Sequence, residues 1–192
     1  MENEKNLPKR KKLRIKQYDY SLSGAYFVTI CIKDRKRILS EIFKSEKTDN
    51  IDDPVQRQTF ENFDISQIRL TEIGKIAEKY LLSSENIPGV KIDHYVIMPD
   101  HIHAVIFLDS NKYTKHDDRF SMEKTQNRGS ANETLPHVIS VFKRFCNKEA
   151  GENIFQRGYY EHIIRNKEDY EAGVKYIYEN PINWYNSIFS EE

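Results

Sequence analysis

His101 and His103 are spaced two residues apart, as the ligands of a metal ion often are in a strand. They directly follow Pro99-Asp100. If this segment is a β-strand, alternate side chains share a face, so both imidazoles can converge on one metal ion while Ile102 points into the core. Imidazole nitrogens ligate several divalent transition metals. Such a pair on a sheet surface also arises by chance, so the spacing alone leaves a metal site and an ordinary pair of histidines open.

A second polar group lies near the end of the chain, in a segment with helical periodicity. Tyr170, Val174 and Ile177 are spaced like the buried stripe of a helix. Tyr176 and Asn180 form an i, i+4 pair on a different face, so both could address the same ion or phosphate. The alternative is that Tyr176, one of twelve tyrosines, is a half-buried packing residue.

Hydrophobic periodicity and turn residues predict the elements that must position these side chains. Helices are predicted to be capped by Thr71, to begin at Leu135, and to be capped by Asn166 and end at Pro181. The predicted strands are residues 24–32, 90–98, 103–108 and 159–164, with 38–43 as a further short strand. The order β-α-β-β-α-β, followed by a helix, predicts an α+β fold of the ferredoxin-like split β-α-β type. This fold is a four-stranded antiparallel sheet with helices on one face, to which a C-terminal helix carrying Tyr176 is added.

Length and composition predict one compact domain. The chain has 192 residues, of which 38% are hydrophobic, enough for one modest core. Residues 1–20 are predicted to form a basic N-terminal arm. Residues 21–192 are predicted to form a single domain with polar insertions near 44–64 and 109–134. The formal net charge is zero, so any affinity for nucleic acid must come from local patches such as the arm.

The sequence contains no apolar run of about 20 residues that would span a membrane, and its polar, basic start is unlike a secretory signal. Cys31 and Cys146 each lie in an apolar run and are predicted to be buried free thiols. We therefore expect a cytoplasmic protein without a membrane partner.

Four motifs in order along the chain resemble one known family. They are Tyr18-Asp19-Tyr20 with Gly24-Ala25-Tyr26-Phe27-Val28-Thr29, then Pro99-Asp100-His101-Ile102-His103, then Phe155 to Asn166, and finally Tyr176-Ile177-Tyr178-Glu179-Asn180-Pro181. Together they resemble the HUH-superfamily transposases with a single tyrosine, in particular the REP-associated tyrosine transposases. Phe155 replaces a tryptophan of the family pattern.

The resemblance implies an enzyme that cleaves and rejoins single-stranded DNA by tyrosine transesterification, through a 5′-phosphotyrosine intermediate, in transposition or at repetitive palindromic elements. It implies that Tyr176 is the nucleophile, that His101 and His103 bind a divalent metal, Mg²⁺ or Mn²⁺, and that Asn180 is the third ligand. His162 is the rival third ligand. Tyr159, Tyr160 and Tyr178 are rival tyrosines, ranked below Tyr176.

The expected partner is single-stranded or hairpin DNA. Its backbone would be bound by basic residues of the arm and of the later helices, namely Arg14, Lys16, Lys143, Arg144 and Arg165. For Lys143 and Arg144, a solvated helix face is the alternative. The sequence leaves open whether the last helix completes the site of its own chain or of a partner in a homodimer.

Two other function classes stay open at this level. A catalytically inactive nucleic-acid-binding module would expose aromatic side chains on the open sheet face and would not require Tyr176. A metal-dependent hydrolase acting through water would need His101, His103 and His162 within reach of one metal ion.

Overall fold

The computed structural model describes residues 23–43, 68–109 and 134–189. The predicted basic arm, with Arg14 and Lys16, and the predicted insertion at 44–64 lie outside these residues, and so does most of the insertion at 109–134. Within the described part of the chain, no helix is long and apolar enough to cross a membrane.

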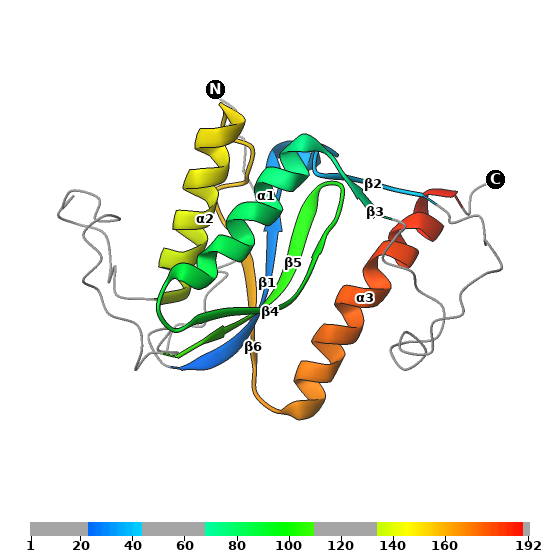
Figure 1. Cartoon of the computed structure of the whole chain (residues 1–192). Helices are drawn as coiled ribbons and strands as arrows, with labels where there is room; N and C mark the ends of the chain where they lie inside the picture. The colour runs from blue at the N-terminus through cyan, green and yellow to red at the C-terminus, as the bar shows by residue number, and fades with distance from the viewer. Residues whose placement is uncertain (1–22, 44–67, 110–133, 190–192) are drawn as a thin grey trace, which may run out of the picture.

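A four-stranded antiparallel sheet forms the centre of the fold (Figure 1). Its strands are β1 (Gly24–Cys31), β4 (Val90–Ile97), β5 (His101–Leu108) and β6 (Tyr160–Ile164), in the spatial order β4-β5-β1-β6. With helix α1 (Glu72–Ser83) after β1 and helix α2 (Thr134–Ala150) after β5, this is the split β-α-β arrangement, so the predicted fold is confirmed. A two-stranded sheet, β2 (Ser40–Ile42) with β3 (Ile68–Leu70), lies outside the central sheet.

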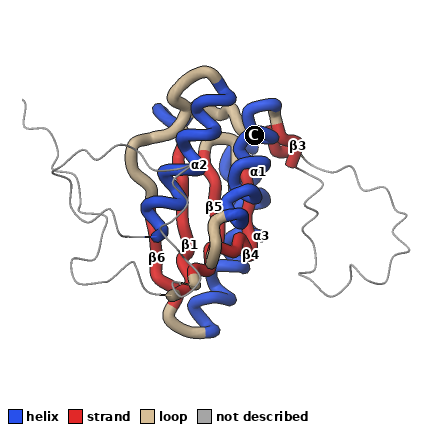
Figure 2. Tube along the Cα trace, turned by 60° about the vertical axis from the view of Figure 1, so that its left-hand side comes forward, coloured by secondary structure: helices blue, strands red, loops and turns tan. Residues whose placement is uncertain are grey.

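Alternation along β1 divides the sheet into two apolar faces. Tyr26, Val28 and Ile30 are fully buried in a core shared with α1 and α2. Phe27 belongs to a second, smaller cluster on the opposite face, together with residues of the last helix, α3 (Lys167–Phe189). Figure 1 shows α1 and α2 on one side of the strands and α3 on the other, and Figure 2 shows β6, β1 and β5 side by side. The sheet is thus covered on both faces.

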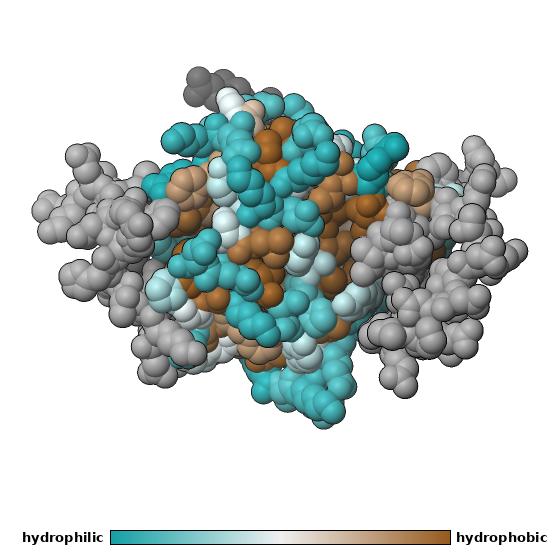
Figure 3. Space-filling model, in the orientation of Figure 1, coloured by the Kyte–Doolittle hydropathy of each residue, from teal (hydrophilic) through white to brown (hydrophobic). Residues whose placement is uncertain are grey.

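The predicted helix caps are present. Thr71 Oγ1 accepts a hydrogen bond from Gly74 N at the start of α1, and Asn166 Oδ1 accepts one from Asp169 N at the start of α3. In the view of Figure 3, the first turns of α3 form the hydrophilic lower end of the molecule, and hydrophobic residues show mainly between the helices. Both cysteines are buried free thiols, as predicted.

The prediction that α3 ends at Pro181 is wrong, because the helix continues through Pro181 to Phe189. A proline inside a helix removes one backbone hydrogen bond and costs about 3 kcal/mol. The extra turns bring Trp184 onto the sheet, where its ring centroid lies 5.9 Å from that of His101. Burial of a large aromatic ring offsets the missing hydrogen bond. The added turns also extend the surface that α3 presents to the histidines.

Candidate functional site

The two histidines lie side by side on the sheet face that α3 covers. In the register of the sheet, His101 is opposite Cys31 and His103 is opposite Thr29 on β1. The two imidazole centroids are 4.5 Å apart, whereas Ile102 between them is fully buried on the other face. Strand alternation therefore brings both rings to one place, as the sequence predicted.

One nitrogen of each imidazole is already engaged by a neighbouring side chain. His101 Nδ1 lies 2.5 Å from Asp100 Oδ1, and His103 Nδ1 lies 2.8 Å from Thr29 Oγ1. When Nδ1–H donates to an oxygen, Nε2 keeps its lone pair for a metal ion. His103 Nε2 is buried and has no hydrogen-bond partner among the described residues. A buried nitrogen without a partner fits a metal ligand better than a structural histidine.

Burial keeps both rings neutral near neutral pH. The pKa of His103 is lowered to about 3, first by burial and then by charge repulsion from His101, when that ring is protonated, and from Arg35. Burial also lowers the pKa of His101, although its hydrogen bond to Asp100 acts in the opposite direction. Neutral imidazole is the form that binds metals, so the protein holds this pair in its ligand state.

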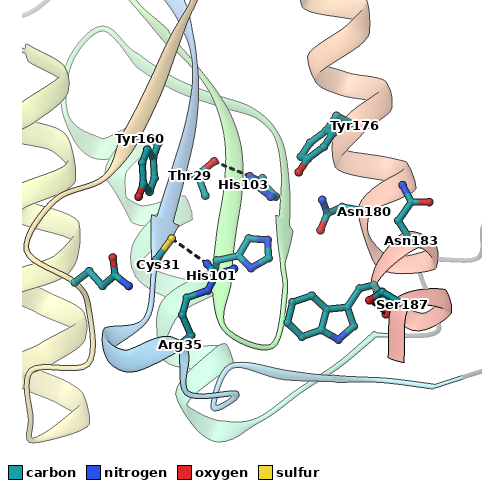
Figure 4. A pocket seen from close by; sticks show the side chains of 12 residues that line it. Thr29, Cys31, Arg35, His101, His103, Tyr160, Tyr176, Asn180, Asn183 and Ser187 are labelled. Atoms are coloured by element: carbon teal, nitrogen blue, oxygen red, sulfur yellow. Dashed lines mark hydrogen bonds between the residues drawn. The ribbon is translucent and has the colours of Figure 1, made fainter. Parts of the chain in front are cut away.

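Helix α3 brings Tyr176 and Asn180 to the histidines within the same chain (Figure 4). The Tyr176 ring packs edge-on against His103 at a centroid distance of 5.1 Å, and its side chain is 48% exposed. One turn later, the Asn180 side chain lies beside His101, whose pKa it acts to raise. The helix is fixed by its buried stripe, in which Val174 and Ile177 are buried against the sheet.

Two polar contacts with β4 also hold α3 in place on either side of Tyr176. Tyr170 Oη donates to Asp93 Oδ2 at 2.5 Å, and this bond raises the pKa of Tyr170 to about 12. Tyr178 Oη lies 3.2 Å from His94 Nδ1. Tyr178, a rival nucleophile in the sequence analysis, is thus directed toward β4 and does not line the cavity described next.

These side chains share a cavity of about 570 Å³ between the sheet and α3. Besides His101, His103, Tyr176 and Asn180, the cavity is lined by Thr29, Arg35, Gln156, Tyr160, Asn183 and Trp184. The cavity is open to one side, and most of the side chains that line it are polar.

Arg35 is a cavity residue that the sequence analysis missed. Its Nε lies 2.9 Å from Asp100 Oδ2, and its Nη1 donates to Cys31 Sγ at 3.2 Å. Arg35 and Asp34 both have positive φ angles, which non-glycine residues rarely adopt and which concentrate at functional sites. A half-exposed guanidinium here can fix the Asp100 carboxylate and also face a phosphate oxygen. No sequence pattern marks Arg35, since its position depends on the turn after β1.

His162, the rival third ligand, lies elsewhere. Its side chain is 58% exposed on β6 and its Nε2 is bonded to Asp169 Oδ1 at 2.7 Å. It does not line the cavity of the histidine pair. Among the described residues there is no group of three or more His, Cys, Asp or Glu side chains that could hold a metal ion. Of the two residues predicted as a third ligand, Asn180 is the one that lines the cavity of the histidine pair.

Comparison with known proteins finds relatives of this chain. An uncharacterized protein of Haemophilus influenzae is 30% identical over 186 residues, which cover 91% of this chain and 89% of that protein. A second Haemophilus influenzae protein, named as a candidate REP-associated tyrosine transposase, is 26% identical over 85% of this chain and 73% of its own length. No family profile matches the chain.

A solved structure also resembles this chain. It is the structure of a REP-associated tyrosine transposase bound to a REP hairpin, and it superposes with a TM-score of 0.52 over 88% of this chain and 73% of its own length, at 20% identity. At that identity the likeness concerns the fold. This chain belongs to the REP-associated tyrosine transposase family.

The basic residues predicted to bind DNA in this family member fall into different environments. Lys143 Nζ donates to the carbonyl oxygens of Gln156 and Gly158 at 2.8 and 2.7 Å, and burial lowers its pKa to about 8. Lys143 therefore holds residues 156–158, just before β6, against α2. Arg144 lines a second cavity, between α2 and that segment, and Arg165 is exposed after β6.

Proposed function

We propose that this transposase family member cleaves and rejoins single-stranded DNA, with Tyr176 as the nucleophile and a divalent metal, Mg²⁺ or Mn²⁺, bound by His101, His103 and Asn180. The observation that carries the proposal is the contact, in one chain, between a half-exposed tyrosine and His103, whose buried Nε2 has no hydrogen-bond partner within the described residues. A tyrosine that served packing alone would not need to lie at the open side of a buried histidine pair.

In this proposal, each residue of the site has a separate role. When bound, the metal would act as a Lewis acid that neutralises charge on the scissile phosphate. Thr29 and Asp100 orient the two imidazoles, and Arg35 adds a positive charge at the cavity. Tyr176 Oη attacks phosphorus and loses its proton, while the P–O3′ bond breaks and the leaving oxygen takes up a proton. The products are a 5′-phosphotyrosine and a free 3′-hydroxyl, and attack by another 3′-hydroxyl rejoins the strand.

The expected substrate is single-stranded or hairpin DNA. The solved transposase structure with a bound REP hairpin supports this class of substrate. The two other function classes fit less well. The hydrolase needs His162 at the histidine pair, and the inactive module needs an open sheet face, which α3 covers.

A trapping experiment tests the proposal. The protein is incubated with Mn²⁺ and a labelled library of hairpin oligonucleotides with randomised single-stranded flanks, and denaturing gels detect covalent protein–DNA adducts. Wild type should form an adduct, whose DNA is sequenced to give the cleavage position, whereas Tyr176→Phe should form none. Tyr178→Phe is the matched control, because it lies on the same helix but faces β4.

Two outcomes would overturn the proposal. DNA cleavage that survives in Tyr176→Phe would indicate hydrolysis by water. Binding without cleavage by both proteins would indicate an inactive DNA-binding module.

A further inference from the structure

Tyr160 is the largest exposed side chain beside the histidine pair that the proposed chemistry leaves without a role. It is 53% exposed and lines the cavity from β6. In the sheet register, Tyr160 is opposite Thr29, and Thr29 is opposite His103, so the three residues form one row across β6, β1 and β5. Neighbouring strands are about 4.8 Å apart, which puts the Tyr160 backbone roughly 10 Å from that of His103.

The two tyrosines of the cavity differ in their surroundings. The Tyr176 ring packs against Phe27 and His103, at centroid distances of 5.8 and 5.1 Å. No comparable ring contact is made by Tyr160 with the residues that the structure describes. Figure 4 shows the two side chains entering the cavity from different sides, Tyr160 from β6 and Tyr176 from α3, with His103 between them. Within the described residues, a face of the Tyr160 ring is therefore available to a molecule bound in the cavity.

The direction of attack decides which part of the DNA meets Tyr160. In a displacement at phosphorus, the attacking and leaving oxygens lie roughly in line on opposite sides of the phosphorus atom. With the phosphate held at the histidine pair, Tyr176 Oη approaches from α3, and the leaving O3′ points to the opposite side of the cavity, where Tyr160 lies (Figure 4). The nucleotide that carries this O3′, called the upstream nucleotide here, is then the one beside Tyr160.

We propose that Tyr160 is a stacking platform for the unpaired base of the upstream nucleotide, and that it thereby sets the direction in which the strand crosses the site. This inference rests on the proposed strand cleavage by Tyr176. An exposed aromatic ring stacks on any base without requiring a particular sequence, and each such contact changes affinity by roughly 10-fold.

A double-mutant cycle between protein and DNA tests the inference. Wild type, Tyr160→Ala and Tyr160→Phe are assayed on an oligonucleotide whose cleavage position is known from the trapped adduct. The same oligonucleotide is also made with an abasic site at the upstream nucleotide or at the nucleotide after the cleaved bond. DNA affinity and the yield of covalent adduct are measured for each pair. Phe43→Ala is the control, since Phe43 is 43% exposed but does not line the cavity.

Tyr160→Ala should weaken binding of the intact oligonucleotide roughly 10-fold, and Tyr160→Phe and Phe43→Ala should bind like wild type. On DNA lacking the upstream base, wild type and Tyr160→Ala should bind equally, because the contact is already lost. An abasic site after the cleaved bond should leave the difference between them intact.

The inference is overturned if Tyr160→Ala binds intact DNA like wild type while the adduct still forms, or if the coupling appears at the nucleotide after the cleaved bond. Loss of adduct in Tyr160→Phe would also overturn it, since that result would make the hydroxyl of Tyr160 essential. If wild type forms no adduct with any hairpin, the strand-cleavage proposal itself fails, and the stacking role fails with it.

Discussion

Thr29 Oγ1 lies 2.8 Å from Nδ1 of His103, directly across from it on the neighbouring strand. This contact fixes the ring of His103, a cavity residue whose buried Nε2 has no hydrogen-bond partner in the part of the chain that the structure describes. His101 is oriented in the same manner by Asp100. The proposed metal site thus depends on two oxygen atoms that would never touch the ion.

Removing the hydroxyl of Thr29 should loosen the metal. Thr29→Val keeps the β-branched shape but cannot bond Nδ1, and loss of such a supporting contact typically lowers metal affinity by about 10- to 100-fold. Binding is measured by titrating the protein with Mn²⁺ and following free Mn²⁺ by electron paramagnetic resonance. Thr29→Ser restores the hydroxyl and should bind nearly as wild type does. Equal affinity of the Val variant and wild type would contradict the assigned role.

Replacing Asp100 by Asn should have a comparable effect through His101. The amide keeps an oxygen near Nδ1 but removes the negative charge that both His101 and Arg35 contact. We expect Mn²⁺ affinity to fall by about 10-fold or more. Asp34→Asn is the matched control, because that carboxylate is exposed on the adjacent turn. A similar loss in both variants would show a general charge effect instead of an oriented imidazole.

The third ligand can be assigned by comparing two variants. Asn180→Ala should reduce both Mn²⁺ affinity and adduct formation by at least about 10-fold, because the amide lies beside His101 on the helix of Tyr176. His162→Ala should leave Mn²⁺ affinity within about 2-fold of wild type, since its imidazole is bonded to Asp169 outside the cavity. The reverse ranking of the two variants would make His162 the ligand.

Acid should destabilise the metal-free protein through His103. Its pKa is about 3 in the folded chain, against about 6.5 for an exposed histidine, so between these values the unfolded chain binds a proton that the native chain does not. Stability therefore falls as pH drops through this window. Between pH 6.5 and pH 5, protonation of His103 in the unfolded chain should lower the free energy of unfolding by about 1.5 kcal/mol.

Urea unfolding in the presence of a chelator measures this loss. His103→Gln cannot take up the proton, so its free energy of unfolding should fall by about 1.5 kcal/mol less than that of wild type over the same interval. An identical pH dependence in both proteins would show that His103 is protonated or exposed in the native state.

The fold could be predicted because its signals are local. Apolar runs rich in β-branched and aromatic residues predict β1 and β5. Together with the caps at Thr71 and Asn166 and the order of strands and helices, they point to the split β-α-β sheet, and the structure confirms it. The helix end at Pro181 could not be predicted, since a local helix-breaking tendency is outweighed there by the contact of Trp184 with the sheet. The short strand β3 was also missed, because its three residues are too few for a periodic pattern.

By itself, the sequence determined that His101 and His103 share a face and that Tyr176 and Asn180 lie one turn apart, because both relations follow from the periods of a strand and a helix. Only the tertiary structure decided that these two pairs meet in one chain, that His162 stays apart, and that Arg35 and Tyr160 join the cavity. The physical reason is that these contacts join segments far apart in the chain, whose distances depend on sheet register and on the packing of α3.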